Sequence, residues 1–293
     1  IEKNIFSNKI DSKSNQREKK NKQKEIVMSL LKIRYRSKLM CRHVHFNVFL
    51  PDDTPDWFLQ NNKNYDRPTK TLFLLHGYDG DQDTWIVESD VLNYAYQQNL
   101  AVVFPAAENS FYVDSAATGK QYCSFIGKEL VEYVRKNFNL AQKREDTLIV
   151  GFSMGGFGAM HIGLSHPDTF IGCAGLSSAN IIRGIAQLKP GENNGVANYE
   201  YFSGIFGDLS KVVESSYNLE VLYDNLVKEN KSIPKIFMAC GTEDFLLEPN
   251  RQLAKYFSDK KADCTYLEGP GNHNMQFWFE YLPKAVDFLI HKN

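Results

Sequence analysis

A serine lies between two glycines in Gly151-Phe152-Ser153-Met154-Gly155, a G-x-S-x-G pattern that follows the apolar run 147–150. Such a pattern between a strand and a helix is typical of a nucleophile elbow, where the glycines permit a tight and strained turn. Residues 155–160 begin the predicted helix. We therefore predict Ser153 as a nucleophile. The alternative is a serine that caps a helix after a buried strand.

A histidine and two carboxylates follow this serine in the chain order that a Ser-acid-His triad requires. Glu243 and Asp244 come directly after a predicted strand at 235–240, and His273 ends a glycine-rich loop after the next strand. A serine hydroxyl needs a base to take its proton and a third group to orient that base. We predict His273 as the base. Neighbouring side chains leaving a strand point apart, so only one of the two carboxylates can face the histidine, and we favour Asp244 over Glu243 as the acid.

Backbone amides suited to an oxyanion hole occur at two places. Met154 directly follows the serine, and Tyr78 lies in the loop His76-Gly77-Tyr78 after the predicted strand 71–75. Amides at these two positions would meet at the same edge of a parallel sheet, so we predict the N–H groups of Tyr78 and Met154 as the oxyanion donors. His76 is either a second candidate base or the residue that shapes this turn, and we favour the turn.

The remaining polar and sulfur-containing residues give no sign of a metal or cofactor. The five cysteines are widely spaced without a C-x-x-C pair, which argues against both a zinc site and a disulfide framework. We expect no metal, no cofactor and a reducing, cytoplasmic location. Five histidines are predicted to be surface or packing residues: His43, His45, His161, His166 and His291.

The elements that must position the candidate residues alternate between strand and helix. Residues 31–36 and 44–50 alternate apolar and polar side chains, which predicts two half-buried, antiparallel strands. Strands covered on both faces are predicted from continuous apolar runs at 71–75, 100–104, 147–150, 170–176, 235–240 and 265–267. Helices are predicted at 122–138, 219–229, 250–258 and 275–291. This alternation predicts a mostly parallel central sheet with helices on both faces.

The segment 181–232 interrupts this alternation and is too long for an ordinary connection between a strand and a helix. We predict that it is an inserted cap or lid over the site; the alternative is a surface embellishment without a role in binding. Six aromatic residues are candidates for lining a substrate pocket, although aromatics are also ordinary core material: Trp85, Phe111, Tyr112, Phe202, Phe206 and Trp278.

The charge of the 293-residue chain is unevenly distributed. Residues 1–27 carry a net +4, and because the whole chain carries −1, residues 28–293 carry −5. The polar, basic tail cannot bury enough apolar surface to fold, so we expect it to be disordered and dispensable, with Met28 as a natural start. The alternative is a basic arm that binds nucleic acid. The acidic body and the lack of a 20-residue apolar run argue against nucleic-acid and membrane partners. A small molecule is the expected partner, and a homo-oligomer is allowed for.

Five separated motifs carry a resemblance to a known family. Over about residues 30–290 the chain resembles the esterase D and tributyrin esterase branch of the α/β-hydrolases, which also contains S-formylglutathione hydrolases, acetyl and feruloyl esterases and mycolyl transferases. The motifs are Leu74-Leu75-His76-Gly77-Tyr78, Asn109-Ser110-Phe111-Tyr112-Val113-Asp114, Gly151-Phe152-Ser153-Met154-Gly155-Gly156-Phe157-Gly158-Ala159, Cys240-Gly241-Thr242-Glu243-Asp244-Phe245 and the run from His273 to Trp278. The resemblance implies an α/β-hydrolase fold, a triad of Ser153, Asp244 and His273, and oxyanion amides at Tyr78 and Met154.

The resemblance also implies a serine carboxylesterase that hydrolyses short-chain acyl esters through an acyl-enzyme. Within the hydrolases, the alternatives are a feruloyl or acetyl-polysaccharide esterase and an S-formylglutathione hydrolase. The loop His76-Gly77-Tyr78 looks more like tributyrin esterases than S-formylglutathione hydrolases, and Asn274-Met275-Gln276 departs from many feruloyl esterases. An acyltransferase and a non-catalytic ligand-binding fold are the alternatives from other classes.

Overall fold

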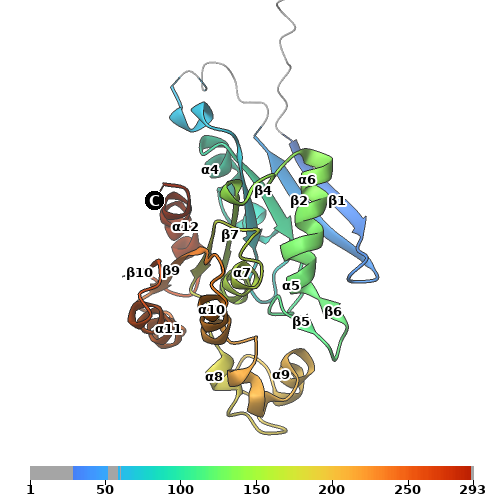
Figure 1. Ribbon diagram of the computed structural model, residues 1–293, viewed down its shortest axis with the longest axis vertical. Helices are drawn as coiled ribbons and strands as arrows, with labels where there is room; N and C mark the ends of the chain where they lie inside the picture. Colours follow the sequence, from blue (N-terminus) through green and yellow to red (C-terminus); the bar gives the residue numbers. More distant parts are fainter. Residues whose placement is uncertain (1–28, 52–58, 60, 292–293) are drawn as a thin grey trace, which may run out of the picture.

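The computed structural model describes residues 29–51, 59 and 61–291 (Figure 1). The predicted tail 1–27 and Met28 lie outside the described residues. An eight-stranded sheet has the order β1-β2-β4-β3-β7-β8-β9-β10, and β5 and β6 form a separate short hairpin. The strands are β1 (Ser29–Arg36), β2 (His43–Leu50), β3 (Lys70–Leu75), β4 (Leu100–Pro105), β5 (Asp114–Ser115), β6 (Lys120–Gln121), β7 (Thr147–Phe152), β8 (Gly172–Leu176), β9 (Lys235–Gly241) and β10 (Cys264–Gly269).

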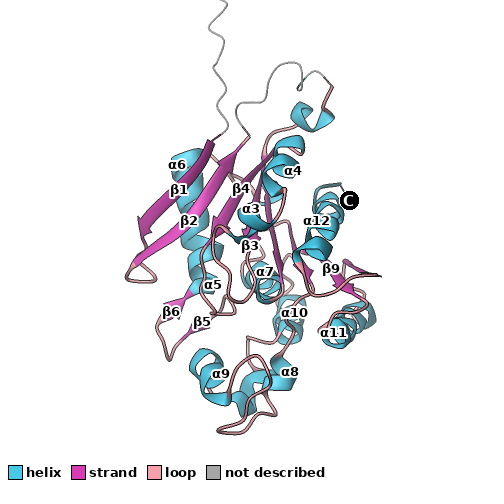
Figure 2. Ribbon diagram, turned by 180° about the vertical axis from the view of Figure 1, so that it is seen from behind, coloured by secondary structure: helices cyan, strands magenta, loops and turns pink. Residues whose placement is uncertain are grey.

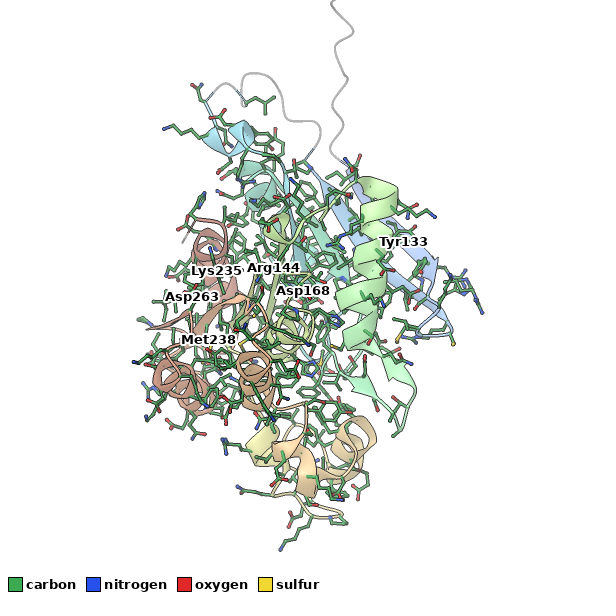
Figure 3. The ribbon with its side chains drawn as sticks, viewed as in Figure 1. Tyr133, Arg144, Asp168, Lys235, Met238 and Asp263 are labelled. Atoms are coloured by element: carbon green, nitrogen blue, oxygen red, sulfur yellow. The ribbon has the colours of Figure 1, made fainter. Side chains whose placement is uncertain are left out.

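Six neighbouring strands, from β4 through β3 to β10, pair in parallel, and β1 and β2 pair antiparallel at one edge. The mostly parallel sheet predicted from the sequence is therefore confirmed. Lys235, at the start of β9, lies farther from the helices α8 (Ile182–Ile185) and α9 (Tyr199–Phe206) than Met238 in the same strand (Figure 3). The carboxyl ends of the strands thus face these two helices.

The sheet is the middle of three layers, and its two faces carry separate hydrophobic cores. Helices α3, α4 and α12 cover one face, and α5, α6, α7, α10 and α11 cover the other (Figures 1 and 2). Their bounds are α3 (Thr84–Glu88), α4 (Val91–Gln97), α5 (Tyr122–Ser124), α6 (Val131–Phe138), α7 (Met154–Ser165), α10 (Leu219–Lys228), α11 (Leu247–Asp259) and α12 (Met275–His291). No helix in the described ranges is long and apolar enough to cross a membrane.

Three details differ from the sequence prediction. The prediction that β2 is half-buried is wrong for two residues, because Asn47 and Phe49 on its predicted outer face are buried. Asn47 donates to the Gln82 carbonyl at 3.0 Å and to Asp83 at 2.8 Å, which covers this side of the strand. The predicted helix 122–138 has a π-helical segment, η2 (Phe125–Leu130), between α5 and α6. Helices α3 and α4 and the hairpin β5-β6 are too short or polar for the patterns to predict.

The predicted insertion 181–232 contains α8, α9, the 3-10 helix η4 (Leu209–Glu214) and α10. Helices α8 and α9 lie beyond the carboxyl ends of the strands, whereas α10 packs on α7 (Figure 1). The outer part of the insertion is therefore placed over the sheet edge where parallel strands present functional loops, and we refer to residues 181–214 as the cap. Two further 3-10 helices are η1 (Lys63–Asp66) and η3 (Arg144–Asp146).

Glu129 in η2 ties the antiparallel pair to the helical layer. Its carboxylate accepts hydrogen bonds from the Tyr35 hydroxyl at 2.5 Å and from the Ser37 hydroxyl at 2.7 Å, and also from the amides of Lys38 and Leu39. Partial burial raises the pKa of Glu129, but these hydrogen bonds outweigh it and hold the pKa below its ordinary value.

Glu129→Gln should lower the free energy of unfolding at pH 7 by about 1–2 kcal/mol, because hydrogen bonds to a charged group are lost. Because the pKa of Glu129 is lower in the folded protein than in the unfolded chain, its carboxylate gives its full stabilisation above the unfolded pKa of about 4.3. This stabilisation is lost as the pH falls through the pKa of the folded state. Urea unfolding between pH 3 and 7 should therefore show a flatter acid limb for Glu129→Gln than for the wild type. Glu132→Gln, on the same helical layer but exposed, is the control; an equal loss in both variants would contradict the assignment.

Candidate active site

Ser153 lies in a strained turn between β7 and α7. Its backbone has φ 53° and ψ −121°, a conformation that side chains rarely adopt. The amide of Ser153 donates to the Leu176 carbonyl at 2.9 Å, which fixes the turn on the neighbouring strand. A Cβ atom on Gly151 would lie 2.2 Å from the Gly155 carbonyl oxygen, and one on Gly155 would lie 2.4 Å from that of His76. Only glycine fits at these two positions of the motif, because neighbouring backbone segments lie too close for a side chain.

A chain of hydrogen bonds joins Ser153, His273 and Asp244. His273 Nε2 is 2.9 Å from Ser153 Oγ, and His273 Nδ1 is 2.8 Å from Asp244 Oδ2 and 3.1 Å from Oδ1. The side chain of Asp244 is fully buried, and that of His273 is 18% exposed. The structure thus brings together the three side chains that the sequence singled out across 120 residues.

Asp244 is held as a carboxylate. Burial raises its pKa, but hydrogen bonds from His273 and from the Leu246 amide outweigh this effect and leave the pKa below the ordinary aspartate value. An ionised Asp244 accepts a hydrogen bond from the Nδ1–H group of His273, so the proton stays on Nδ1 and Nε2 is free to accept from the Ser153 hydroxyl. Glu243 points elsewhere and accepts from the Gly271 amide at 2.6 Å.

The two predicted oxyanion amides follow adjacent parallel strands. Leu75 at the end of β3 is paired with Gly151 in β7, so the loop with Tyr78 and the start of α7 at Met154 lie at the same sheet edge. Among the described residues, neither amide donates to a protein acceptor. Both N–H groups thus lie at one sheet edge without a protein acceptor, which an oxyanion donor requires.

His76 shapes the loop that carries Tyr78. It is buried, and its Nε2 accepts from the Ala107 amide at 3.0 Å, so the ring proton must lie on Nδ1, which is 2.7 Å from the Gly77 carbonyl oxygen. Burial lowers the pKa of His76, which favours this neutral form. Both ring nitrogens are thus engaged with the backbone, as the turn-shaping hypothesis requires.

An apolar pocket of about 270 Å³ opens onto Ser153 and His273. Its wall combines the body of the protein with the cap, which contributes Ile181, Asn194, Val196 and Phe202. The lining residues are Tyr78, Asp79, Phe111, Phe152, Ser153, Met154, Ala179, Ile181, Asn194, Val196, Phe202, Phe245, Leu246, His273 and Trp278. This volume is just below the range of ordinary ligand pockets, which runs from about 300 to 1,000 Å³.

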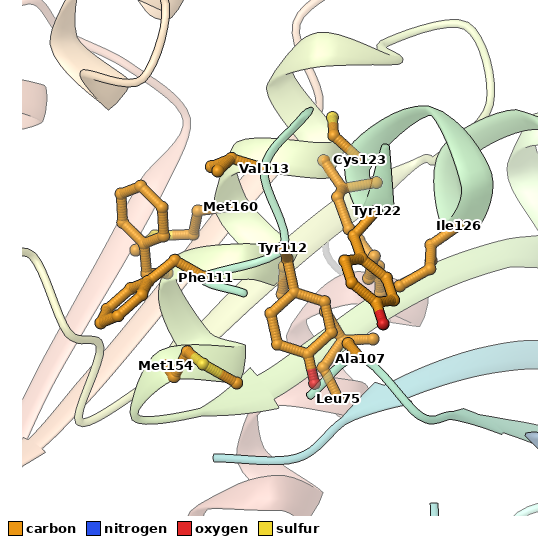
Figure 4. Close-up of a cluster of buried hydrophobic side chains, with 14 of the residues drawn as sticks. Leu75, Ala107, Phe111, Tyr112, Val113, Tyr122, Cys123, Ile126, Met154 and Met160 are labelled. Carbon is orange, nitrogen blue, oxygen red and sulfur yellow. The ribbon is translucent and has the colours of Figure 1, made fainter. Parts of the chain in front are cut away.

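Three of the six aromatic candidates line this pocket, namely Phe111, Phe202 and Trp278. The other three need correction, because they are buried in the layers around it: Trp85 donates to the Leu75 carbonyl at 3.0 Å, Tyr112 donates to the His76 carbonyl at 2.9 Å, and Phe206 packs on Phe111. Figure 4 shows the Tyr112 ring directed towards Leu75 and Ala107 within the buried cluster.

Several pocket residues were not identified from the sequence. Phe245 is 67% exposed, and its ring centroid is 4.6 Å from that of His273. Its position directly after Asp244 was the available signal. Ile181 and Val196 come from the cap, where no periodic pattern indicates which residues face inward. In the part of the chain that the structure describes, no cluster of His, Cys, Asp or Glu is placed to hold a metal ion.

The sheet order, the strained serine turn and the hydrogen-bonded Ser-His-Asp geometry define an α/β-hydrolase. The chain belongs to the esterase family described as "Putative esterase", which matches residues 37–289. It is 37% identical over 262 residues to an acetyl esterase of Caldicellulosiruptor saccharolyticus, covering 89% of this chain and 98% of that protein. The protein is therefore a carboxylic ester hydrolase.

Two solved structures extend the comparison. A fluorophosphonate-binding serine hydrolase of Staphylococcus aureus is 30% identical with a TM-score of 0.77, covering 90% of this chain and 99% of that one. An S-formylglutathione hydrolase of the same organism is 30% identical with a TM-score of 0.74, covering 90% of this chain and 100% of that one.

Gly155→Ala should disturb both folding and the site, because the added methyl group meets the carbonyl oxygens of His76 and Leu75 at 2.4 and 2.7 Å. We expect a loss of about 1–3 kcal/mol in unfolding free energy, as for other overpacked sites, and a marked loss of esterase activity. Gly204→Ala in α9 is the matched control, since nothing lies within 4 Å of its Cβ. Equal stability of the two variants in thermal unfolding would show that the backbone at Gly155 leaves room for a methyl group beside His76 and Leu75.

Proposed function

We propose that the protein is a serine carboxylesterase that hydrolyses short-chain acyl esters through an acyl-enzyme. The observation that carries the proposal is the continuous hydrogen-bond chain from Ser153 through His273 to Asp244 at the mouth of a small apolar pocket. The 37% identity to an acetyl esterase over nearly the full length of that protein supports a short acyl group.

The geometry supports a two-step reaction. His273 Nε2 takes the proton of Ser153 Oγ as the oxygen attacks the ester carbonyl, and the amides of Tyr78 and Met154 hold the resulting oxyanion. His273 then gives the proton to the leaving alcohol, and the acyl group remains on Ser153. Water repeats the sequence on the acyl-enzyme and releases the carboxylic acid. Asp244 keeps the proton on Nδ1 of His273 and stabilises the imidazolium.

A second candidate is hydrolysis of S-formylglutathione, which the 30% identity to an S-formylglutathione hydrolase favours. The charges around the pocket argue against it. None of the residues lining the pocket is lysine or arginine, and Asp79 adds a carboxylate at its wall. Glutathione thioesters carry carboxylates, and this wall offers no cation to pair with them. We therefore place neutral short-chain esters first.

Ser153→Ala should lower the hydrolysis of p-nitrophenyl acetate by about 10⁴-fold or more, because the nucleophile is lost while the fold is kept. The exposed Ser258→Ala in α11 is the control and should keep its activity. A fluorophosphonate probe should label the wild type and Ser258→Ala but leave Ser153→Ala unlabelled. Turnover that survives in Ser153→Ala would sink the assignment of the nucleophile.

A substrate panel separates the ester classes. Initial rates on p-nitrophenyl esters from C2 to C8, methyl ferulate, acetylated xylan fragments and S-formylglutathione should be highest for the C2–C4 esters. Preference for S-formylglutathione by kcat/KM would reverse the order of the two candidates while leaving the triad in place.

Ile181 should limit the length of the acyl chain. It lines both the pocket at Ser153 and a second cavity of about 210 Å³, which extends over Leu219 and Leu253. Ile181→Ala should join the two spaces and shift the optimum in the C2–C8 series by about two or more carbons, since each buried CH₂ adds about 0.8 kcal/mol. Ile182→Ala is the matched control, because Ile182 lines only the second cavity. An unchanged optimal acyl length in Ile181→Ala would show that the acyl chain does not extend towards Ile181.

A further inference from the structure

Asn109 is a residue of the quoted motifs that the proposed reaction does not use. It follows β4 and lies next to the loop that carries Tyr78. Its side-chain oxygen accepts from the backbone amide of Asp79 at 2.9 Å, and its Nδ2 donates to the Asp79 carboxylate at 3.2 Å. A backbone amide can only donate and a carboxylate only accept, so this orientation of the Asn109 amide is set by its partners.

Asp79 needs such support, because its backbone has φ 63° in the left-handed region. Its amide belongs to the peptide bond between Tyr78 and Asp79. The preceding peptide bond, between Gly77 and Tyr78, is held at its carbonyl by His76 Nδ1 and by the Gly80 amide. Asn109 and His76 therefore hold the two peptide planes on either side of the Tyr78 Cα atom. The direction of the Tyr78 N–H follows from these planes.

The cap is attached to the same point. The Tyr201 hydroxyl of α9 donates to the backbone carbonyl of Asn109, and the Tyr201 ring packs edge-on against the Tyr78 ring with centroids 6.0 Å apart. Helix α9 thus contacts both Asn109, which holds the loop, and Tyr78, which lines the pocket.

We propose that Asn109 is a positioning residue for the oxyanion hole, which holds the Tyr78 N–H towards the reacting carbonyl and links it to the cap helix α9. This inference rests on the proposed function, because it assigns Tyr78 as an oxyanion donor. It concerns the transition state alone, in which Ser153 Oγ has added to the carbonyl and its proton has moved to His273. No further reactant is needed. The ground-state carbonyl depends less on this N–H than the oxyanion does.

Asn109→Ala should lower kcat on p-nitrophenyl acetate by about ten-fold with KM little changed, short of the 10²–10³-fold cost of removing an oxyanion donor altogether. Affinity for a short alkyl trifluoromethyl ketone, which forms a hemiketal oxyanion with the serine, should fall by a similar factor. Asn93→Ala in α4 removes a comparable exposed hydrogen bond, from Asn93 to Asp90 just before the helix, and should change neither value.

A charge exchange distinguishes positioning from folding. Asn109→Asp places two carboxylates side by side and should lose more activity than Asn109→Ala. In the double variant with Asp79→Asn, the side chain at position 79 becomes the donor and the carboxylate at position 109 the acceptor. The hydrogen bond between them is restored, so the double variant should regain most of kcat. Tyr201→Phe should lower kcat by a smaller factor, and this factor should shrink in an Asn109→Ala background because both changes act through residue 109.

The inference is overturned if kcat and the ketone affinity of Asn109→Ala stay within two-fold of the wild type. It is also overturned if the charge exchange recovers thermal stability but no kcat, which would assign Asn109 a purely structural role. A loss of activity that tracks the unfolded fraction in all the variants would do the same. The failure of the proposed function would look different, because Ser153→Ala would then retain turnover.

Discussion

The contact on which the site depends is the approach of the first turn of α7 to the end of β3. The backbone at Gly155 lies so close to the His76 carbonyl that no side chain fits between them. This approach places the start of α7 beside the loop with Tyr78, so that the amides of Tyr78 and Met154, which follow different strands, lie at the same edge of the sheet. The strain of the Ser153 backbone is offset by hydrogen bonds through its amide and its carbonyl, to Leu176 and from Ala179, both at 2.9 Å.

A second constraint is the buried charge of Asp244. A carboxylate without solvent is costly unless it is paired, and here the Leu246 amide and His273 supply its partners. The loop that carries His273 is brought close by glycines, because a Cβ on Gly241 would lie 2.2 Å from the Gly271 carbonyl oxygen. The position of the proposed base therefore depends on its hydrogen bonds to Asp244 and on two loops that meet backbone to backbone.

Much of this arrangement could be predicted from the sequence, and the limits have physical causes. The parallel sheet and the order of Ser153, Asp244 and His273 follow from apolar runs and from residues placed after strands, which are local patterns. Which residues line the pocket depends on packing between distant parts of the chain. Phe111 and Tyr112 are neighbours, yet Phe111 lines the pocket whereas the Tyr112 hydroxyl donates to the His76 carbonyl. The cap has no regular period, so the inward direction of Ile181 could not be predicted.

The carboxylate of Asp79 sets the last requirement on the loop that carries Tyr78. It lies one residue from the amide of Tyr78, where negative charge develops in the proposed transition state, and two unit charges about 4 Å apart repel by about 1 kcal/mol even in water. A carboxylate turned towards that amide would also compete for its hydrogen bond. Its bond to Asn109 directs it instead to an exposed position, where solvent screens it. The same pairing thus fixes the geometry of the loop and keeps its charge from opposing the reaction, which explains how an acidic side chain is tolerated at this wall.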